Sequence, residues 1–315
     1  MSARNWTLFG IVSVLWGIPY LFISIAVDDG VPPAFLAWFR VVLGALILLP
    51  VAWRAGLLGG LRDRWRWILP YAVLEIVIPF PMIATGEQHV SSSVTAILIA
   101  STPLLVALLA IRFDPAERAH GMRLVGLLVG LVGVICLVGI DIAGDGDELL
   151  GAGAILIAAL GYAAGPMLLK RKLGDVDARA SMLGALAVAG VLLLPFAALD
   201  VPSRDALTTE AVASLIVLGA LCTAAAFVAF GMLITSVGPG RGLVFTYVNP
   251  LVAVIAGIVV LGEEPGPGAI LGLGLILAGS YLATGGGPPP GGEREPTTSP
   301  HAAAVGADPV RTTGS

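Results

Sequence analysis

The sequence predicts an all-α integral membrane protein with ten transmembrane helices arranged as two inverted five-helix repeats. The first indication is composition: 57% of the residues are hydrophobic, 12% are charged, and the mean hydropathy is +0.96. The second is the recurrence of apolar runs of about 20 residues, which span a hydrocarbon core of roughly 30 Å as helices. The third is that the second half of the chain repeats the pattern of the first. These features exclude an ordinary soluble globular protein.

The apolar segments define the expected organisation of the chain. We predict one repeat over residues 6–141, a second over residues 150–284, and a disordered cytoplasmic tail over residues 285–315. The tail is rich in proline and glycine and offers no apolar face. The expected helices span residues 6–27, 34–53, 67–86, 92–111, 123–141, 150–169, 180–199, 211–234, 243–261 and 267–284.

The repeat is seen most clearly where two apolar arms flank an acidic turn. An offset of 146 residues places Glu117 on Glu263, Gly126 on Gly272, and Gly133 on Gly279. The early prolines of the two arms, Pro103 and Pro250, differ by 147, so one residue is gained or lost between proline and turn. Because five helices are an odd number, the second half is expected to be inverted in the membrane, an arrangement that suits alternating access.

The distribution of basic residues predicts the orientation. With the N-terminus in the cytoplasm, 15 of the 17 lysines and arginines fall in cytoplasmic segments. Arg204 lies in an outer loop and Arg40 lies within a helix. Basic residues near helix ends favour the cytoplasmic side, so both termini are predicted to be cytoplasmic. The scarcity of lysine beside arginine and the abundance of alanine and glycine are typical of a bacterial source, which implies the bacterial plasma (inner) membrane.

Several short motifs are spread over the two halves of the chain. They are Leu15-Trp16-Gly17, Arg40, and the stretch from Gly86-Glu87-Gln88-His89 to Pro103, followed by Tyr162-Ala163, Asn249-Pro250 and Leu261-Gly262-Glu263. With these motifs the chain resembles two EamA-type domains of the drug/metabolite transporter superfamily. The resemblance covers nearly all of residues 8–284 and implies a ten-helix inverted-repeat carrier, often an exporter, of metabolites, amino acids, sugars or drugs. Tyr162 stands where the family usually has tryptophan.

Two charged residues are predicted to lie within the membrane. Arg40 is about 10 Å from the outer end of the second helix and Glu75 about 12 Å from the inner end of the third. Charges at this depth are costly unless they are paired or face a wet cavity, so they indicate function. The alternatives are a structural Arg40–Glu75 ion pair, a direct role in transport, or an Arg40 that snorkels to the outer interface. Glu75 is the candidate for a proton-coupling group.

Prolines are predicted to break or bend four helices. They are Pro19, Pro79, Pro103 and Pro250. Each removes one backbone hydrogen bond, and we expect Pro103 and Pro250 to leave the carbonyl groups of Ile99 and Thr246 open. Polar groups beside such breaks suit a substrate site between the repeats, whereas the alternative is a plain kink. The polar residues at the two breaks are Thr102, Thr246 and Asn249.

Aromatic residues are predicted to form part of a cavity wall. Trp16 and Tyr20 share a helix face with Ser24, and Tyr162 occupies the place of Trp16 in the second half. The alternative is packing between helices. The glycines of the fifth and tenth helices are interpreted as small-residue ridges that allow close helix packing.

The remaining polar groups carry weaker signals. Glu87, Gln88 and His89 could line an external gate, but the favoured interpretation is a solvated turn. No cluster of histidine, cysteine and carboxylate residues has metal-ligand spacing, and the two cysteines lie in apolar runs. No metal and no cofactor are therefore expected.

These features predict a secondary transporter that moves a small organic solute, such as a metabolite, amino acid or drug-like compound, across the plasma membrane by alternating access. Export is the expected direction, with protons as a candidate coupling ion. The lipid bilayer and the solute are the expected partners, nucleic acid is not, and the chain is a monomer or homodimer. The alternatives are an integral-membrane enzyme and a non-transporting scaffold. An enzyme would need a polar catalytic cluster at one membrane face, and the sequence shows none.

Overall fold

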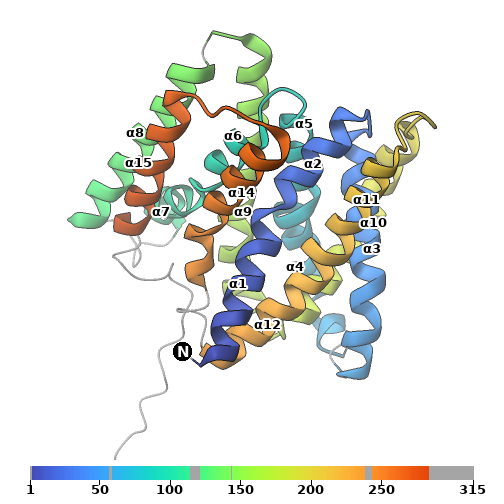
Figure 1. Ribbon diagram of the computed structural model, residues 1–315. Coiled ribbons are helices and arrows are strands. Elements are labelled where there is room, and N and C mark those ends of the chain that lie inside the picture. Colours follow the sequence, from blue (N-terminus) through green and yellow to red (C-terminus); the bar gives the residue numbers. More distant parts are fainter. Residues whose placement is uncertain (1, 57–58, 114–120, 143, 238–242, 284–315) are drawn as a thin grey trace, which may run out of the picture.

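The computed structural model describes residues 2–56, 59–113, 121–142, 144–237 and 243–283, and these form an all-helical bundle (Figure 1). Its first-half elements are α1 (Ala3–Gly17), α2 (Pro19–Asp28), α3 (Pro33–Arg54), α4 (Gly59–Ala72), η1 (Val73–Val77), α5 (Pro79–Gly86), α6 (Ser92–Ile99), α7 (Thr102–Phe113), α8 (Met122–Leu137) and η3 (Val138–Ile142). The second-half elements are α9 (Gly146–Lys172), α10 (Ala178–Leu199), α11 (Thr209–Ile216), η4 (Val217–Ala225), α12 (Ala226–Val237), η5 (Leu243–Tyr247), α14 (Asn249–Ala256), η6 (Gly257–Leu261) and α15 (Pro267–Ala283).

Within the described residues, eight helical stretches are long and apolar enough to cross a membrane. Two shorter apolar helices, Phe245–Leu261 and Pro267–Ala283, correspond to the ninth and tenth predicted spans. All ten predicted segments are therefore helical, with ends within a few residues of those expected, but the last two fall short of full spanning length. The acidic turn at Glu117 and the tail over residues 285–315 lie outside the described residues.

Polar side chains begin several of the helices. Ser91 accepts a hydrogen bond from the backbone N–H of Val94, and the Asp145 carboxylate accepts from the N–H groups of Asp147 and Glu148. These contacts satisfy donors that have no partner inside the helix. These N-cap hydrogen bonds define the residues at which the helices begin.

Six of the membrane segments change their helical winding partway along within the described residues, and one of them is the fifth, where α8 passes into the π-helical turn η3. The first segment passes from α1 to α2 at Pro19, the fourth breaks between Ile99 and Thr102, and the ninth passes from η5 to α14 just before Pro250. The third and eighth segments each contain π-helical turns, η1 and η4. The predicted breaks at Pro19, Pro103 and Pro250 thus coincide with boundaries between elements, and Pro79 opens α5 directly after η1.

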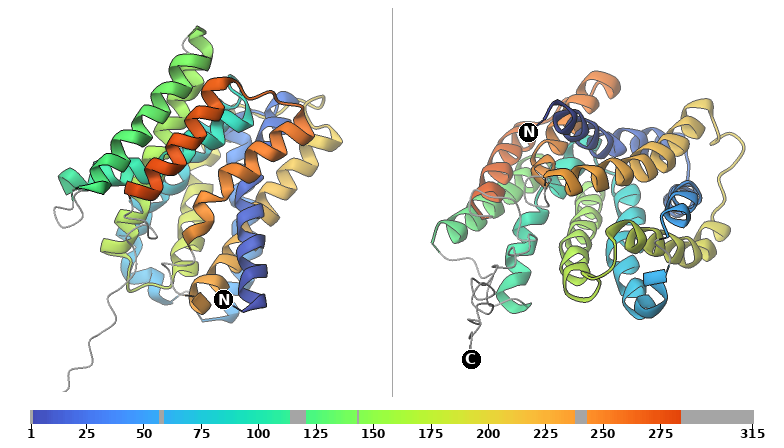
Figure 2. Two further views of the ribbon diagram at one scale, coloured as in Figure 1. Left: turned by 60° about the vertical axis from the view of Figure 1, so that its left-hand side comes forward. Right: turned by 90° about the horizontal axis from the view of Figure 1, so that it is seen from below.

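Helix α8 packs closely along α15 at one edge of the bundle (Figures 1 and 2). A Cβ atom on Gly133 would lie 3.0 Å from the carbonyl oxygen of Gly272, and one on Gly272 would lie 3.0 Å from that of Gly133. Gly126 and Gly279 face each other in the same way, at 2.7 Å in both directions. The backbones therefore meet without side chains between them, which confirms the predicted glycine ridges.

The other helices pack around a shared interior. Helix α3 lies against α10, α1 against α12, and α9 against α5 and η1. The largest apolar cluster joins α3, the third segment and α10, and includes Val41, Ile76, Leu183 and Leu186. Polar residues buried in this interior come from segments far apart in the sequence, and they form the candidate site.

Candidate functional site

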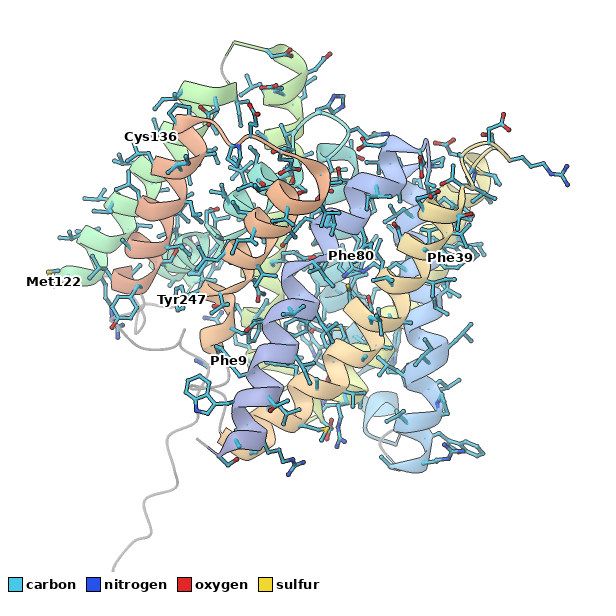
Figure 3. The ribbon with its side chains drawn as sticks, in the orientation of Figure 1. Phe9, Phe39, Phe80, Met122, Cys136 and Tyr247 are labelled. Carbon is cyan, nitrogen blue, oxygen red and sulfur yellow. The ribbon has the colours of Figure 1, made fainter. Side chains whose placement is uncertain are left out.

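Arg40 lies inside the bundle rather than at its surface. Its residue is 7% exposed, and its Nε donates a hydrogen bond to Thr223 Oγ1 at 3.0 Å. Its guanidinium carbon is 4.2 Å from the centroid of the Phe80 ring, a cation–π contact (Figure 3 labels Phe80 in the middle of the bundle). The hypothesis that Arg40 snorkels to the outer interface is therefore wrong, because α3 and η4 hold the side chain within the protein.

The described residues contain no ion pair between Arg40 and Glu75. Arg40 instead interacts electrostatically with Tyr20 of α2 and Tyr162 of α9. The three residues come from three segments, and both tyrosines pack against one buried apolar cluster of the interior. The structural ion pair between Arg40 and Glu75, one of the predicted alternatives, is not formed in this conformation.

Thr223 is the anchor that fixes Arg40. Its Oγ1 accepts from the guanidinium and donates to the carbonyl oxygen of Leu218 at 2.8 Å. Leu218 is five residues earlier, so the hydroxyl hydrogen bond fits the wide turn of η4. Sequence analysis missed Thr223, since a threonine in an apolar helix carries no signal that marks it as the partner of an arginine 183 residues away.

Glu75 lies on the π-helical turn η1. The backbone N–H of Ile78 donates to the carbonyl oxygen of Val73 at 3.0 Å, which closes the turn just before Pro79. π-Bulges of this kind are frequent at functional sites.

The carboxylate of Glu75 faces α9 at a glycine. A Cβ atom on Gly165 would clash with Oε2 and lie 3.3 Å from the carboxyl carbon of Glu75. Oε2 is buried and has no hydrogen-bond partner, and the group interacts electrostatically with Tyr71 and Tyr162. A buried carboxylate oxygen without a partner is costly, which indicates a group that binds a proton or a ligand.

Glu87 is a second buried carboxylate, contrary to the expectation of a solvated turn. It is 4% exposed, and neither oxygen has a hydrogen-bond partner, whereas Gln88 and His89 are exposed. Glu87 interacts electrostatically with Glu263, Asp28 and Arg40. Its position at the end of a span gave no sign of burial, because the burial depends on how α5 packs against α9, α3 and α2.

The break in the fourth segment is closed by side chains. Thr102 Oγ1 donates to the carbonyl oxygen of Ile99 and Ser101 Oγ to that of Leu98, both at 2.6 Å. The expectation that the Ile99 carbonyl stays open is therefore wrong. Hydroxyl groups next to a proline supply the hydrogen bond that the proline removes.

The break in the ninth segment is tied to the first helix. With its amide oriented to satisfy both groups, Asn249 donates to the carbonyl oxygens of Phe245 at 3.0 Å and Ser13 at 3.2 Å. Trp16, one turn after Ser13, packs on Phe245 with ring centroids 4.9 Å apart. Thr246 is half-buried beside them. Trp16 and Asn249 thus join α1 to the ninth segment, and Thr246 follows Phe245 within η5.

Two carboxylates hold helix N-termini at the opposite end of the bundle from the N-terminus of the chain. Glu263 accepts from the backbone N–H groups of Ser92 (2.8 Å) and Ser93 (3.1 Å) and from the Ser93 hydroxyl. Asp141 accepts from Gly268 (3.0 Å) and Ala269 (2.6 Å) at the start of α15. Negative groups are stabilising at these positions because the N-terminal end of a helix carries partial positive charge.

The turn that aims Glu263 depends on one glycine. Gly262 has a φ of 69°, a left-handed conformation that favours glycine, and the N–H of Glu263 donates to the carbonyl oxygen of Gly257. The chain thereby reverses immediately after η6. This geometry brings the acidic turn of the second half onto α6 of the first half.

Among the described residues, no group of three or more histidine, cysteine or carboxylate residues is arranged to hold a metal ion. Cys136 and Cys222 are free thiols. The interior groups described above are one guanidinium (Arg40), two carboxylates (Glu75 and Glu87), three tyrosines (Tyr20, Tyr71 and Tyr162) and the hydroxyl of Thr223. Such a set can bind a polar solute and exchange protons.

Comparison with known proteins gives a consistent picture. A sequence model of the EamA-like transporter family matches residues 4–139 and 149–285. The uncharacterized inner membrane transporter YedA of Escherichia coli (strain K12) is 30% identical over 278 residues, covering 86% of this chain and 87% of that protein. The uncharacterized transporter YoaV of Bacillus subtilis (strain 168) is 25% identical over 283 residues, covering 88% and 96%. One crystal structure, 19% identical, matches with a TM-score of 0.63 over 90% of this chain and 97% of its own, and supports the fold alone.

Proposed function

Because this chain belongs to the EamA-like transporter family and is a multi-pass membrane protein, we propose that it exports a small organic solute across the bacterial plasma membrane by alternating access. The family and the transporter-named relatives point to transport rather than to enzymatic chemistry. The relative YedA is named as an inner membrane protein, which supports the same location here. Both termini are placed in the cytoplasm, and the protein acts as a monomer or homodimer.

The observation that carries this proposal is the buried polar group around Arg40. A guanidinium held between Thr223 and Phe80, with Tyr20 and Tyr162 beside it, offers a fixed positive site inside an apolar bundle. Charged residues at membrane depth mark solute pathways because burial without a function is costly. The set favours a metabolite, amino acid or drug-like solute with an anionic group for Arg40.

An arrangement of ten helices as two inverted five-helix repeats, over residues 6–141 and 150–284, supplies the two conformations that alternating access needs. It is supported by the pairing of α8 with α15. Adding the offset of 146 to Gly133 gives Gly279, and subtracting it from Gly272 gives Gly126. The contact of Gly133 with Gly272 therefore corresponds to that of Gly279 with Gly126. The same offset carries η1, at 73–77, to 219–223, which lies within η4.

Proton coupling is assigned to Glu75. Its Oε2 is buried without a partner, on a π turn, next to the interior tyrosines. A carboxylate in such a place can bind a proton in one conformation and release it in the other. Glu87 is the second candidate, since both of its oxygens are buried and unpartnered.

The test is untargeted mass spectrometry of the medium around cells that produce the wild type, Arg40→Gln, Arg204→Gln or no transporter. Arg204 is an exposed arginine of the outer loop and is the matched control. We expect one or more solutes to accumulate outside with the wild type and with Arg204→Gln, but not with Arg40→Gln. Equal accumulation with both variants would remove Arg40 from the site. Depletion from the medium instead of accumulation would reverse the proposed direction.

A further inference from the structure

A polar pocket of about 530 Å³ lies between α4 and the end of α9. The start of α4 and the end of α9 lie at the end of the bundle that carries the N-terminus, the lower end in Figure 1 and the near face in the right-hand view of Figure 2. The side chains that line this α4–α9 pocket are Arg64, Trp67, Lys170, Arg171, Lys172 and Asp175. Its volume is within the range of small-molecule sites.

The cations of the pocket are held in place by contacts between different segments. Arg64 forms an ion pair with Asp175, and the Lys172 ammonium lies 4.7 Å from the centroid of the Trp67 ring. Arg171 donates a hydrogen bond to the carbonyl oxygen of Phe113 at the end of α7. Side chains ordered in this way lose less conformational entropy when a ligand binds.

The chemistry of the lining fits a phosphate group. The lining has cationic side chains from both helices, among them Arg64 of α4 and Lys172 of α9, and Asp175 is its one carboxylate. A guanidinium has five N–H donors in a planar fork, so Arg64 can hold Asp175 and still donate to a phosphate oxygen. Lys172 adds a point charge from the facing helix.

The position of the pocket matches the level of lipid head groups. Arg64 begins one candidate membrane span and Lys172 ends another, so both lie where the apolar segments leave the membrane. Basic pockets between transmembrane helices on the cytoplasmic side bind phospholipid head groups. Helix-dipole complementarity explains why three cations end α9, but it does not explain why Arg64 and Trp67 of another helix face them.

We propose that the α4–α9 pocket binds the phosphate group of an anionic ligand, and that an anionic phospholipid of the cytoplasmic leaflet is its source. The head group then bridges the start of the third segment and the end of the sixth. The site is independent of the transported solute.

The experiment titrates the purified full-length protein in detergent with short-chain phosphatidylglycerol, phosphatidylcholine or inorganic phosphate, and counts bound ligands by native mass spectrometry. The pocket variant is Arg64→Gln with Lys172→Gln. The matched control is Arg54→Gln with Arg123→Gln, which removes two exposed cations outside the pocket. We expect phosphatidylglycerol to bind the wild type and the control equally, and the pocket variant at least about tenfold more weakly.

Equal weakening in both variants, or equal binding of phosphatidylcholine, would overturn the proposal in favour of general surface charge. Displacement of phosphatidylglycerol by millimolar inorganic phosphate, from the wild type only, would keep the phosphate site but assign it to a soluble ligand. Thermal melting of the double variant without ligand shows whether the substitutions have impaired its folding. In that case Lys172→Gln alone replaces the double variant, because it retains the ion pair between Arg64 and Asp175.

Discussion

The π turns of the third and eighth membrane segments occupy corresponding places in the two halves, yet their polar side chains are used differently. In η4, Thr223 both accepts from Arg40 and donates to Leu218, so its hydroxyl is fully engaged. In η1, Glu75 has a buried oxygen with no partner, facing Gly165. A π turn therefore carries a hydroxyl group with its hydrogen bonds made in one half, and a carboxylate with an unpartnered oxygen in the other.

The difference separates positioning from chemistry. A satisfied hydrogen-bond network fixes a side chain, as at Arg40, whereas an unsatisfied carboxylate retains the capacity to bind a proton or a ligand. We infer that η4 positions the cation of the site and that η1 carries the group that changes state.

The largest effect is expected from Glu75→Gln. The amide keeps the shape of the side chain but cannot exchange a proton, so solute flux driven by a pH gradient should fall at least about tenfold, equivalent to about 1.4 kcal/mol. Initial rates in proteoliposomes with and without the gradient measure it. Glu264→Gln, at an exposed glutamate of the outer turn, is the control and should retain the wild-type rate. Full pH-dependent transport by Glu75→Gln would falsify the assignment.

Thr223→Val should act mainly on stability. It keeps the volume of the side chain but leaves the Nε of Arg40 and the carbonyl oxygen of Leu218 without their partner. A loss of about 1–2 kcal/mol in the free energy of unfolding is expected, the size found for polar contacts between membrane helices. Denaturant titration in detergent measures it. Thr209→Val, at an exposed position of the same segment, should change little; an equal loss there would show that the Arg40 contact is not responsible.

How much of this site the sequence can predict is shown by Arg40 and its partners. The burial of Arg40 follows from one charge in an apolar run, and the helix ends follow from the apolar lengths. The partner does not follow, because Thr223 is distant in sequence and faces Arg40 only through a π turn that no residue pattern marks. The burial of Glu87 and the closing of the Ile99 carbonyl by Thr102 were missed for a related reason. Both depend on side-chain geometry at helix ends, where sequence periodicity carries no information.

Gly165→Ala should disturb η1 without removing its carboxylate. The added methyl group would meet the carboxylate of Glu75, which must then move. We expect the transport rate to fall about three- to tenfold, with Glu75 still present. Gly153→Ala is the matched control on the same helix, because a Cβ atom there has no neighbour within 4 Å. Equal rates for the two variants, measured in the same proteoliposomes, would mean that the position of Glu75 is unimportant.

The smallest effect is expected at the exposed ion pair between Arg64 and Asp175, which serves as the reference for the buried contacts of Arg40 and Glu75. The hydrogen bond from Arg64 lowers the pKa of Asp175 below its ordinary value of 3.8. The pair therefore contributes stability above that ordinary value, and the contribution is lost as the pH falls through the lowered pKa. Asp175→Asn should shift the melting temperature near pH 7 by less than Thr223→Val does, because exposed ion pairs contribute little. A larger shift would mean that the pair is more than a surface contact.

The glycine seam between α8 and α15 has a further consequence for how such a protein can originate. The contact of Gly133 with Gly272 and that of Gly126 with Gly279 are copies of one another under the 146-residue offset. In a single ancestral half that assembled with a second, inverted copy of itself, one substitution to glycine would have improved two contacts at once. If two such halves were then joined in one chain, each contact would become free to change alone, and the unequal π turns are the kind of divergence that this freedom permits.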